Sequence, residues 1–452
     1  MKLENLTLAN YRGFEQIELE FTGDLTVIAG VNGIGKSSIL SAIATVASHL
    51  LPVISSAKKE SLELSADDIH TGKPALTVSA LWTTAGGPFH AQVVRSSKDE
   101  AKAGEYRKRR DQARFDLRQT AKGSKEEWKL LEEIRYLDEL LRPDADHFTY
   151  QCDGDASTYL ALILNYPAQP LVIHYSTERY FRGMPKRLLE VKPLSPADAN
   201  TDALAGMEVK LNEFANWFRV VQAGKRTAFG KRLRGMLDDA IAKLLPGFSG
   251  LQLEQDPLPH FTVQKAGKIM KLGQLSDGEQ GLLALVFDIT RRLAIANPQS
   301  KSPLTEGTAV VLIDEIELHL HPTWQRQALR HLLEVFPACQ FVITTHSPQV
   351  IGQVKPEKLR LLHPDEAGKV RLHLLSQSFG MDSSWILQNI MGCAAREYEV
   401  EQKLSAIFDL IDARKYPAAR KAVTALREEV GMFPELQEAD SLLARIKLLS
   451  RK

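Results

Sequence analysis

Short, almost entirely apolar runs recur along the chain, and each is followed by a polar or glycine-rich turn. A strand covered on both faces has this pattern, so the runs predict the strands of a buried sheet. Alternating apolar and polar residues over 17–21 predict a half-buried strand just before the first run. The runs assigned to the buried sheet are 25–29, 171–175, 310–313 and 341–344.

Helical spacing of apolar residues predicts helices between these strands. Strand, glycine-rich turn and helix follow one another at the first run, and strand, helix, strand at the last two, which favours a β-α-β unit. The predicted class is therefore α/β with a mixed central sheet. The expected helices are 37–51, 208–245, 281–296 and much of the chain after 384, and the expected further strands are 261–263, 360–362 and 369–375.

One stretch, residues 98–142, is dense in alternating charge and includes Arg107-Lys108-Arg109-Arg110. We interpret it as one or two exposed helices, broken near Gly123-Ser124. It is either a solvated insertion or a basic surface that contacts nucleic acid or a partner.

The predicted domain boundaries follow these changes in pattern. Two halves of one α/β core are separated by the insertion, a linker and a helical subdomain, and a helical region follows them. The expected ranges are 1–97 (first half), 98–142 (insertion), 143–205 (core and linker), 206–260 (helical subdomain), 261–375 (second half) and 376–452 (helical domain for docking or oligomerisation).

Composition limits the class of protein. The 452 residues are 44% hydrophobic and 25% charged, with 57 basic against 56 acidic side chains and a net charge of +1. This balance argues against a surface coated in positive charge, although a local basic face fits it. Three widely spaced cysteines form no disulfide framework, which indicates a reducing cytoplasm. We find no apolar run near the roughly 20 residues of a membrane span and no signal peptide at the start of the sequence.

A phosphate-binding loop is the strongest chemical signal. Residues 30–37, GVNGIGKS, fit G-x-x-x-x-G-K-[ST] and come directly after a buried strand. In such a loop backbone N–H groups, here from Asn32, Gly33 and Gly35, surround phosphate oxygens. Lys36 reaches the β- and γ-phosphates, and the Ser37 hydroxyl binds Mg²⁺.

A second buried strand, residues 310–313, ends in two carboxylates. At the tip of the strand Asp314 can hold the Mg²⁺ water shell, and Glu315 can polarise the attacking water as a general base. A strand that ends in acids is a weak signal alone, but together with the loop at Lys36 it predicts ATP hydrolysis.

Two further motifs occur in order along the chain. Ser276 and Glu279 in LSDGEQ form an S-x-x-E capping box at the start of an apolar helix. The same segment resembles the signature motif of ATP-binding-cassette (ABC) proteins, in which the serine hydroxyl and glycine N–H, here Ser276 and Gly278, bind the γ-phosphate of a nucleotide held by another subunit. His346 follows a buried strand and resembles the switch histidine of that superfamily.

With these four motifs the chain resembles an ABC-type ATPase of the branch that contains the Rad50, RecF and SMC heads and the overcoming-lysogenisation-defect proteins. The opening NYRGF, residues 10–14, is similar to the N-terminal strand-turn of that branch. The resemblance implies an ABC-type P-loop head, ATP and Mg²⁺ as ligands, and a homodimer or higher homo-oligomer. It adds Arg12, Ser38 and Glu279 to the expected nucleotide contacts. The largely globular segment between Lys36 and Ser276 excludes the long coiled coils of Rad50 and SMC.

A narrower resemblance is to the ATPase of Septu-type anti-phage systems and its retron-associated relatives. The segments that carry it are EIELHLHP with the following TWQ, FANWF, YSTER, and FGMDS with the residues after it. Because no D-x-D cluster follows His346 and no HNH-like or zinc-knuckle pattern is present, we expect the chain to lack a nuclease. The resemblance then implies a separate HNH nuclease as partner, in antiviral defence.

Several assignments stay open at this stage. The glutamine that usually links the first half to the nucleotide is not evident, and Gln151 is a candidate. His319 and His321 favour packing and hydrogen bonding over a metal site. Apolar stripes near the C-terminus predict helices that either cap the core or dock a partner. The stripe residues are Leu404, Ile407, Ile411, Ala418, Ala422, Leu426, Leu442, Ile446 and Leu449.

The leading hypothesis is an ATPase with sites formed between subunits that controls a partner nuclease. One alternative is a RecF-type DNA repair or recombination ATPase, which would bind DNA through a basic surface. Another is a regulatory scaffold that binds ATP with little turnover. Lys36 and Glu315 are both present, which argues against an inactive enzyme.

Overall fold

The computed structural model forms two compact units, Met1–Gly380 and Met381–Lys452. Secondary structure is described for all residues except 59–60, 85–86, 97–99, 121–129, 132, 135–136, 138–146, 154–167, 180, 183–193, 207–208, 224–227, 394–395 and 450–452.

The first unit contains a five-stranded antiparallel sheet of order β2-β1-β4-β5-β6. One face of the sheet is buried, and apolar and polar residues accordingly alternate along β4 and β5. The alternation predicted over 17–21 lies in β2. The strands are β1 (Lys2–Tyr11), β2 (Phe14–Glu20), β4 (Ala75–Thr84), β5 (Gly87–Ser96) and β6 (His147–Asp153).

The second sheet has six strands in the order β16-β15-β3-β14-β13-β7. All neighbouring pairs are parallel except β15 with β16, so the mixed central sheet predicted from the sequence is confirmed. Three of the four apolar runs form the neighbouring central strands β3, β14 and β13, and the run 171–175 forms the edge strand β7. The strands are β3 (Leu25–Ala29), β7 (Val172–Tyr175), β13 (Val310–Ile313), β14 (Gln340–Thr345), β15 (Leu359–Pro364) and β16 (Val370–His373).

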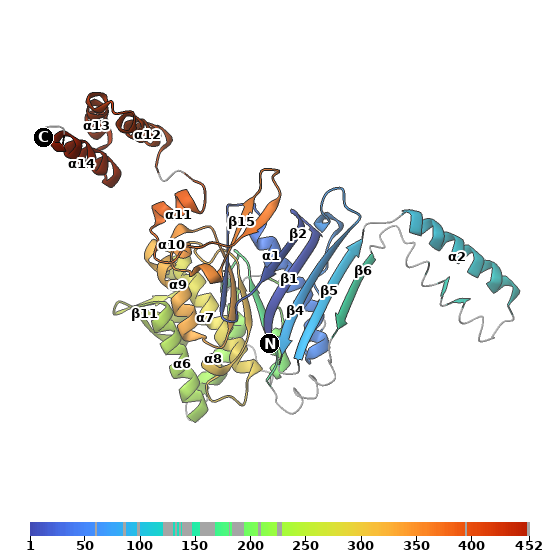
Figure 1. Cartoon of the computed structure of the whole chain (residues 1–452). Coiled ribbons are helices and arrows are strands. Elements are labelled where there is room, and N and C mark those ends of the chain that lie inside the picture. The colour runs from blue at the N-terminus through green and yellow to red at the C-terminus, as the bar shows by residue number, and fades with distance from the viewer. Residues whose placement is uncertain are drawn as a thin grey trace. The chain divides into compact units, whose positions relative to one another are not determined.

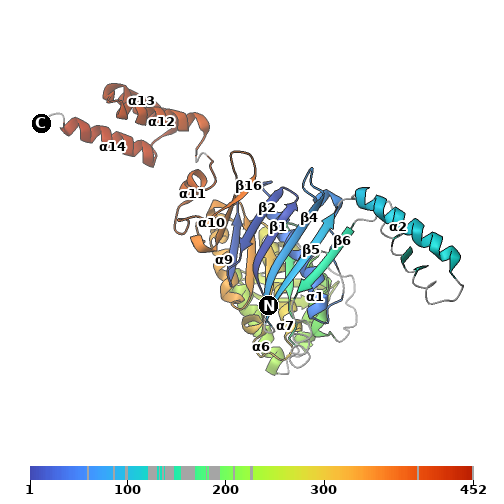
Figure 2. The same cartoon turned by 45° about the vertical axis from the view of Figure 1, so that its right-hand side comes forward.

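Helix α1 (Lys36–Ile54) lies between the two sheets, as both views show (Figures 1 and 2). Its side chains belong to one buried cluster with residues of both sheets. With 19 residues and a mean hydropathy of 1.7, it is long and apolar enough to pass for a membrane span, which the sequence analysis overlooked. Since 67% of its most apolar stretch is buried, the helix is a core helix covered by two sheets.

Helices cover the other face of the mixed sheet (Figure 1). Phe214 of α5 stacks on Phe287 of α7 with ring centroids 4.2 Å apart, and Phe218 and Phe261 complete this aromatic core. The helices are α5 (Leu211–Ala223), α6 (Ala228–Leu244), α7 (Asp277–Ala296), α8 (Pro303–Glu306), α9 (Pro322–Val335) and α10 (Pro348–Ile351), with 3₁₀ turns at Ala66–Asp68, Pro196–Asn200, Leu272–Gln274 and Pro356–Lys358.

Residues 206–260, predicted to be a helical subdomain, also contain strands. β10 (Phe248–Glu254) pairs with β11 (His260–Lys265), which pairs with β12 (Lys268–Lys271). The helical spacing of apolar residues ends at residue 244 because strand β10 follows, where every second residue from Leu251 to Leu253 is buried. A parallel pair joins β8 (Phe181–Arg182) to β9 (Val209–Lys210).

In the charged insertion, α2 (Glu100–Gln119) is a helix, as expected. The predicted break near Gly123-Ser124 lies outside the described residues.

The second unit is helical, with α11 (Ser383–Asn389), α12 (Tyr398–Asp412), α13 (Tyr416–Val430) and α14 (Pro434–Leu449). Leu404, Ile407, Ile411 and Leu426 lie in its core as predicted, whereas the predicted Ala418 and Leu442 are exposed. Their neighbours Ala419 and Leu443 are buried instead. Both pairs are adjacent apolar residues, so spacing alone left the register open by one position.

Candidate functional site

The predicted site residues follow strands that run side by side in the mixed sheet. β3 ends at Ala29 before the glycine-rich loop, β13 ends at Ile313 before Asp314, and β14 ends before His346. Parallel pairing aligns Ile313 with Ile343 and Thr345 with Ala29, so the three turns meet at the carboxyl edge of the sheet. Ligands bind at this edge in open α/β sheets.

Two glycines shape the loop at residues 30–37. Gly35 has φ 106°, and a Cβ atom there would lie 2.6 Å from the ring of Phe14. Gly30 has φ 155°, and its Cβ would lie 2.8 Å from the carbonyl oxygen of Leu362. Only glycine fits both positions. Asn32, Gly33 and Ser37 are exposed on the loop, so its backbone N–H groups and the Ser37 hydroxyl are accessible to a ligand.

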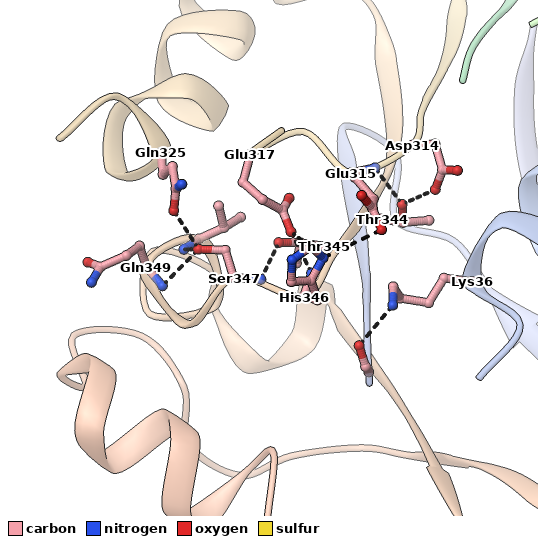
Figure 3. A network of polar contacts seen from close by, with 12 residues as sticks. Lys36, Asp314, Glu315, Glu317, Gln325, Thr344, Thr345, His346, Ser347 and Gln349 are labelled. Atoms are coloured by element: carbon pink, nitrogen blue, oxygen red, sulfur yellow. Dashed lines mark hydrogen bonds and ion pairs between the residues drawn. The ribbon is translucent and has the colours of Figure 1, made fainter. Parts of the chain in front are cut away.

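The Lys36 ammonium lies over the loop and donates to the carbonyl oxygens of Gly30 at 2.9 Å and Val31 at 3.0 Å (Figure 3). Lys36 is only 5% exposed. Burial lowers its pKa, while the nearby carboxylates of Glu315, Glu317 and Asp314 oppose that shift. The ammonium therefore lies at the glycine-rich loop, where it could bind an anion, and beside the carboxylates that follow the neighbouring strand.

Asp314 and Glu315 are fixed by the neighbouring strand. The Thr344 hydroxyl donates to Asp314 Oδ1 and accepts the backbone N–H of Glu315 at 2.8 Å (Figure 3). Asp314 is 6% exposed, whereas the Glu315 side chain is 23% exposed. Glu315 has φ 45°, a left-handed conformation that costs a non-glycine residue roughly 1–2 kcal/mol. Such strain persists only where the surrounding contacts impose it.

His346 lies between two carboxylates. Its Nδ1 is 3.5 Å from Glu315 Oε1 and 3.2 Å from Glu317 Oε1. Glu317 also accepts the His346 backbone N–H at 2.6 Å, while its Oε2 is buried without a hydrogen-bond partner. The two acids thus hold the predicted switch histidine beside the predicted base, and Figure 3 shows the three side chains together.

The signature segment begins α7. Ser276 is its N-cap, and its backbone N–H donates to Glu279 Oε2 at 3.0 Å, so the capping box predicted from the sequence is confirmed. Glu279 also pairs with Lys265 at 2.5 Å. Ser276 is exposed, whereas a Cβ on Gly278 would lie 2.3 Å from the carbonyl oxygen of His319. Gly278 therefore has a packing role of its own, because only glycine allows α7 to approach the turn after Glu315 so closely.

The motifs divide into two groups within one chain. Lys36, Asp314, Glu315 and His346 lie together, while no hydrogen bond or ion pair among the described residues joins Ser276 to the loop at 30–37. A signature serine that serves a nucleotide held by another copy needs no such bond to the loop of its own chain.

Ser38 lies in the first turn of α1, and Arg12, in the turn between β1 and β2, donates through Nη1 to Ser38 Oγ at 3.2 Å. Arg12 also pairs with Asp68 at 2.8 Å, which fixes its guanidinium beside the loop at 30–37.

Gln151 was a candidate for the glutamine that links the first half to the nucleotide, but it lies within edge strand β6, opposite Gln92. The residues that follow β7 are the ones beside Asp314, because the Asp314 backbone N–H donates to Tyr175 O at 2.8 Å. The Gln151 assignment is therefore not supported by its place in the fold, and the segment Ser176–Arg179 occupies that edge of the sheet instead.

His321 caps α9, with its Nδ1 accepting the Thr323 backbone N–H at 3.3 Å. Among the described residues no group of three or more His, Cys, Asp and Glu side chains could hold a metal ion. The hydrogen-bonding interpretation of His321 fits this capping contact.

Two residues of the site went unrecognised in the sequence. Glu317 lies in EIELHLHP and Arg179 ends YSTER, two segments that carry the narrower resemblance, but neither side chain was given a role. Arg179 donates through Nη1 to Asp314 O and through Nη2 to Glu315 O. Lone charges in polar turns usually face solvent. Only the pairing of β7 with β13 reveals that Arg179 is buried.

Comparison with known families agrees with this arrangement. Residues 1–103 match a family described as "AAA ATPase domain", and residues 182–352 match one described as "AAA domain, putative AbiEii toxin, Type IV TA system". The first match contains the loop at 30–37, and the second contains Ser276, Asp314 and His346.

The relatives include a probable ATPase of a retron and a Septu protein. The "Retron Ec83 probable ATPase" of Escherichia coli is 26% identical over 99% of this chain and 86% of its own length. A "Septu protein PtuA" of Bacillus mycoides is 38% identical over 22% of this chain and 14% of that protein. Among solved structures, an SMC head bound to the C-winged helix domain of ScpA has a TM-score of 0.46 and 16% identity, covering 83% of this chain and 98% of that one.

Proposed function

We propose that this chain, which matches AAA domain families and is similar to a retron ATPase and a Septu protein, hydrolyses ATP at sites shared between two copies and so controls a separate HNH nuclease in anti-phage defence. The observation that carries the proposal is the grouping of Lys36, Asp314, Glu315 and His346 at one sheet edge.

In this proposal Lys36 binds the β- and γ-phosphates, and backbone N–H groups of Asn32, Gly33 and Gly35 surround them. Ser37 and Asp314 would hold Mg²⁺, which neutralises charge on the phosphate oxygens. The accessible Ser37 hydroxyl and the buried, hydrogen-bonded Asp314 suit that role.

Glu315 accepts a proton from the attacking water, and its partial exposure leaves room for that water. His346 lies within 3.5 Å of Glu315 and senses the γ-phosphate beside it. Glu317 keeps the imidazole in place through the His346 backbone N–H.

The facing copy supplies Ser276 and the N–H of Gly278 to complete each site. Support comes from the exposure of Ser276 at the N-terminus of α7, where a helix favours an anion. Glu279 is turned back to Lys265 and the Ser276 N–H, so it shapes this end of the helix.

Support for the nuclease partner comes from the similarity to Septu proteins. The described cysteines Cys152, Cys339 and Cys393 are all free, as a reducing cytoplasm would leave them.

A RecF-type role is the alternative, favoured by the basic run 107–110 on α2. Strong stimulation of ATP turnover by DNA, lost on neutralising Arg107–Arg110, would favour that role over the nuclease partner.

The helical second unit offers a test of the partner. Deleting residues 398–452 removes α12, α13 and α14 but leaves the unit Met1–Gly380 whole. We expect ATP turnover to stay within about twofold of the full chain, while association with the co-expressed HNH nuclease or higher oligomerisation is lost. Size-exclusion chromatography with multi-angle scattering, run with and without the nuclease, measures nuclease association and the oligomeric state.

A point variant serves as the control. Leu448→Glu changes a side chain that is 69% exposed, so the unit should stay folded while its surface changes. A truncated chain that keeps its oligomeric state and still binds the nuclease would contradict the docking role. A truncated chain that unfolds would show that these helices stabilise the core.

A further inference from the structure

We propose that Arg179 is a positioning residue for ATP hydrolysis, whose guanidinium fixes the backbone of the turn at Asp314-Glu315 and thereby the direction of the Glu315 carboxylate. The inference rests on Glu315 acting as the base. It assigns a function to a side chain that contacts neither the loop at 30–37 nor Ser276 through any hydrogen bond among the described residues.

Arg179 reaches the turn because its strand is the neighbour of β13. β7 pairs in parallel with β13, with Tyr175 opposite Ile313. The short segment 176–179 then leaves the same sheet edge, and the Arg179 guanidinium donates to the carbonyl oxygens of two consecutive residues, Asp314 and Glu315. A guanidinium presents its donors as a planar fork, so one side chain can hold two carbonyl groups in a fixed relation.

These contacts complete a set that fixes both peptide planes around Glu315. Thr344 accepts the Glu315 N–H at 2.8 Å, while Arg179 binds the carbonyls on either side of that residue's Cα. Held by these contacts, Glu315 has φ 45°. Without them the residue would adopt a right-handed or extended conformation. Relaxation of that angle would swing the carboxylate away from His346.

The guanidinium is unusual in its surroundings. Arg179 is 6% exposed, and no ion pair joins it to a carboxylate in the described part of the chain. Burial lowers the pKa of Arg179 to about 10, against the opposing effect of Glu317, Asp314 and Glu315, so it stays charged at neutral pH. Burying a charge that bonds only to backbone carbonyls costs free energy. In return, the hydrogen bonds of Arg179 fix the geometry of the turn at Asp314-Glu315.

The base of this segment is itself anchored. The Tyr175 hydroxyl donates to Asp288 Oδ2 at 3.0 Å, and both residues are buried. Asp288 lies in α7, the helix that Ser276 begins. Tyr175, four residues before Arg179, is thus anchored to the helix that Ser276 begins.

Arg179→Lys tests the proposal, because a lysine keeps the charge but cannot hold two carbonyls in one plane. We expect kcat to fall about 10- to 100-fold, the loss typical of a small misplacement of a reacting group, with ATP affinity nearly unchanged. The matched control is Arg360→Lys. Arg360 is 7% exposed and also donates to backbone carbonyls, of Glu20 and Glu357, but away from the site.

Three further readouts separate positioning from folding. Thermal melting compares the stability of Arg179→Lys with that of Arg360→Lys. Low-millimolar guanidinium should restore part of the turnover of Arg179→Ala but not that of Glu315→Gln. In a Glu315→Gln background, Arg179→Lys should lower turnover no further, because both changes act through one carboxylate.

Normal kcat in Arg179→Lys, together with an inactive Glu315→Gln, would overturn the inference and leave the proposed function standing. An active Glu315→Gln would instead overturn the base assignment. If Arg179→Lys fails to fold, guanidinium rescue of Arg179→Ala decides, and an absence of rescue in a folded variant counts against the proposal.

Discussion

Replacing Glu315 with glutamine is expected to lower ATP turnover about 10²- to 10⁴-fold while ATP binding persists. The amide has the shape of the carboxylate but cannot accept the proton of the attacking water. Lys36 and the loop at 30–37 are untouched, so the phosphates keep their contacts. With hydrolysis blocked, the ATP-bound dimer should accumulate. Phosphate release, calorimetric titration and multi-angle scattering measure the three effects.

The control is Glu334→Gln on α9, since Glu334 is 52% exposed and lies only in a loose ion pair with Arg330 at 3.7 Å. Its turnover should equal that of the unaltered chain. Normal turnover in Glu315→Gln would remove Glu315 from the role of general base.

Replacing Lys36 with alanine is expected to weaken ATP affinity at least about 10- to 100-fold and to abolish turnover. The change deletes a buried charge that would face the β- and γ-phosphates, and a hydrogen bond to a charged group contributes roughly 1.5–3 kcal/mol. It also leaves the Gly30 and Val31 carbonyls without their donor.

Calorimetric titration with ATP gives the affinity of Lys36→Ala. Lys355→Ala is a suitable control because Lys355 is exposed at the start of a 3₁₀ turn. Affinity equal to that of the control would show that Lys36 does not bind the phosphates.

The sequence was enough to place the catalytic strands. Buried parallel strands are continuous apolar runs, and a motif at the end of each run marks the sheet edge. The runs at 310–313 and 341–344 form β13 and β14, and α9 connects them as the β-α-β pattern predicted. The phosphate loop was recognisable because its glycines and lysine occur at fixed spacing in one short segment.

Contacts between segments far apart in the chain could not be predicted from the sequence. Arg179 and Glu317 lie in YSTER and EIELHLHP, which carry the narrower resemblance, but strand pairing brings their contacts to them, and the local sequence does not reveal those contacts. Gln151 was chosen by residue type, and its strand proved to be at the edge of the other sheet. The off-by-one stripe at Leu442 has a different cause, because adjacent leucines give two nearly equivalent helical faces.

The most direct test of the shared site is a mixture of two inactive variants, Lys36→Ala and Ser276→Arg. In a mixed dimer one site combines both defects, while the other has an intact Lys36 from one copy and an intact Ser276 from the other. Random mixing in equal amounts makes half of the dimers mixed, so the account predicts about a quarter of the normal ATP turnover. Turnover as low as in either variant alone, with mixed dimers detected through two different tags, would contradict it.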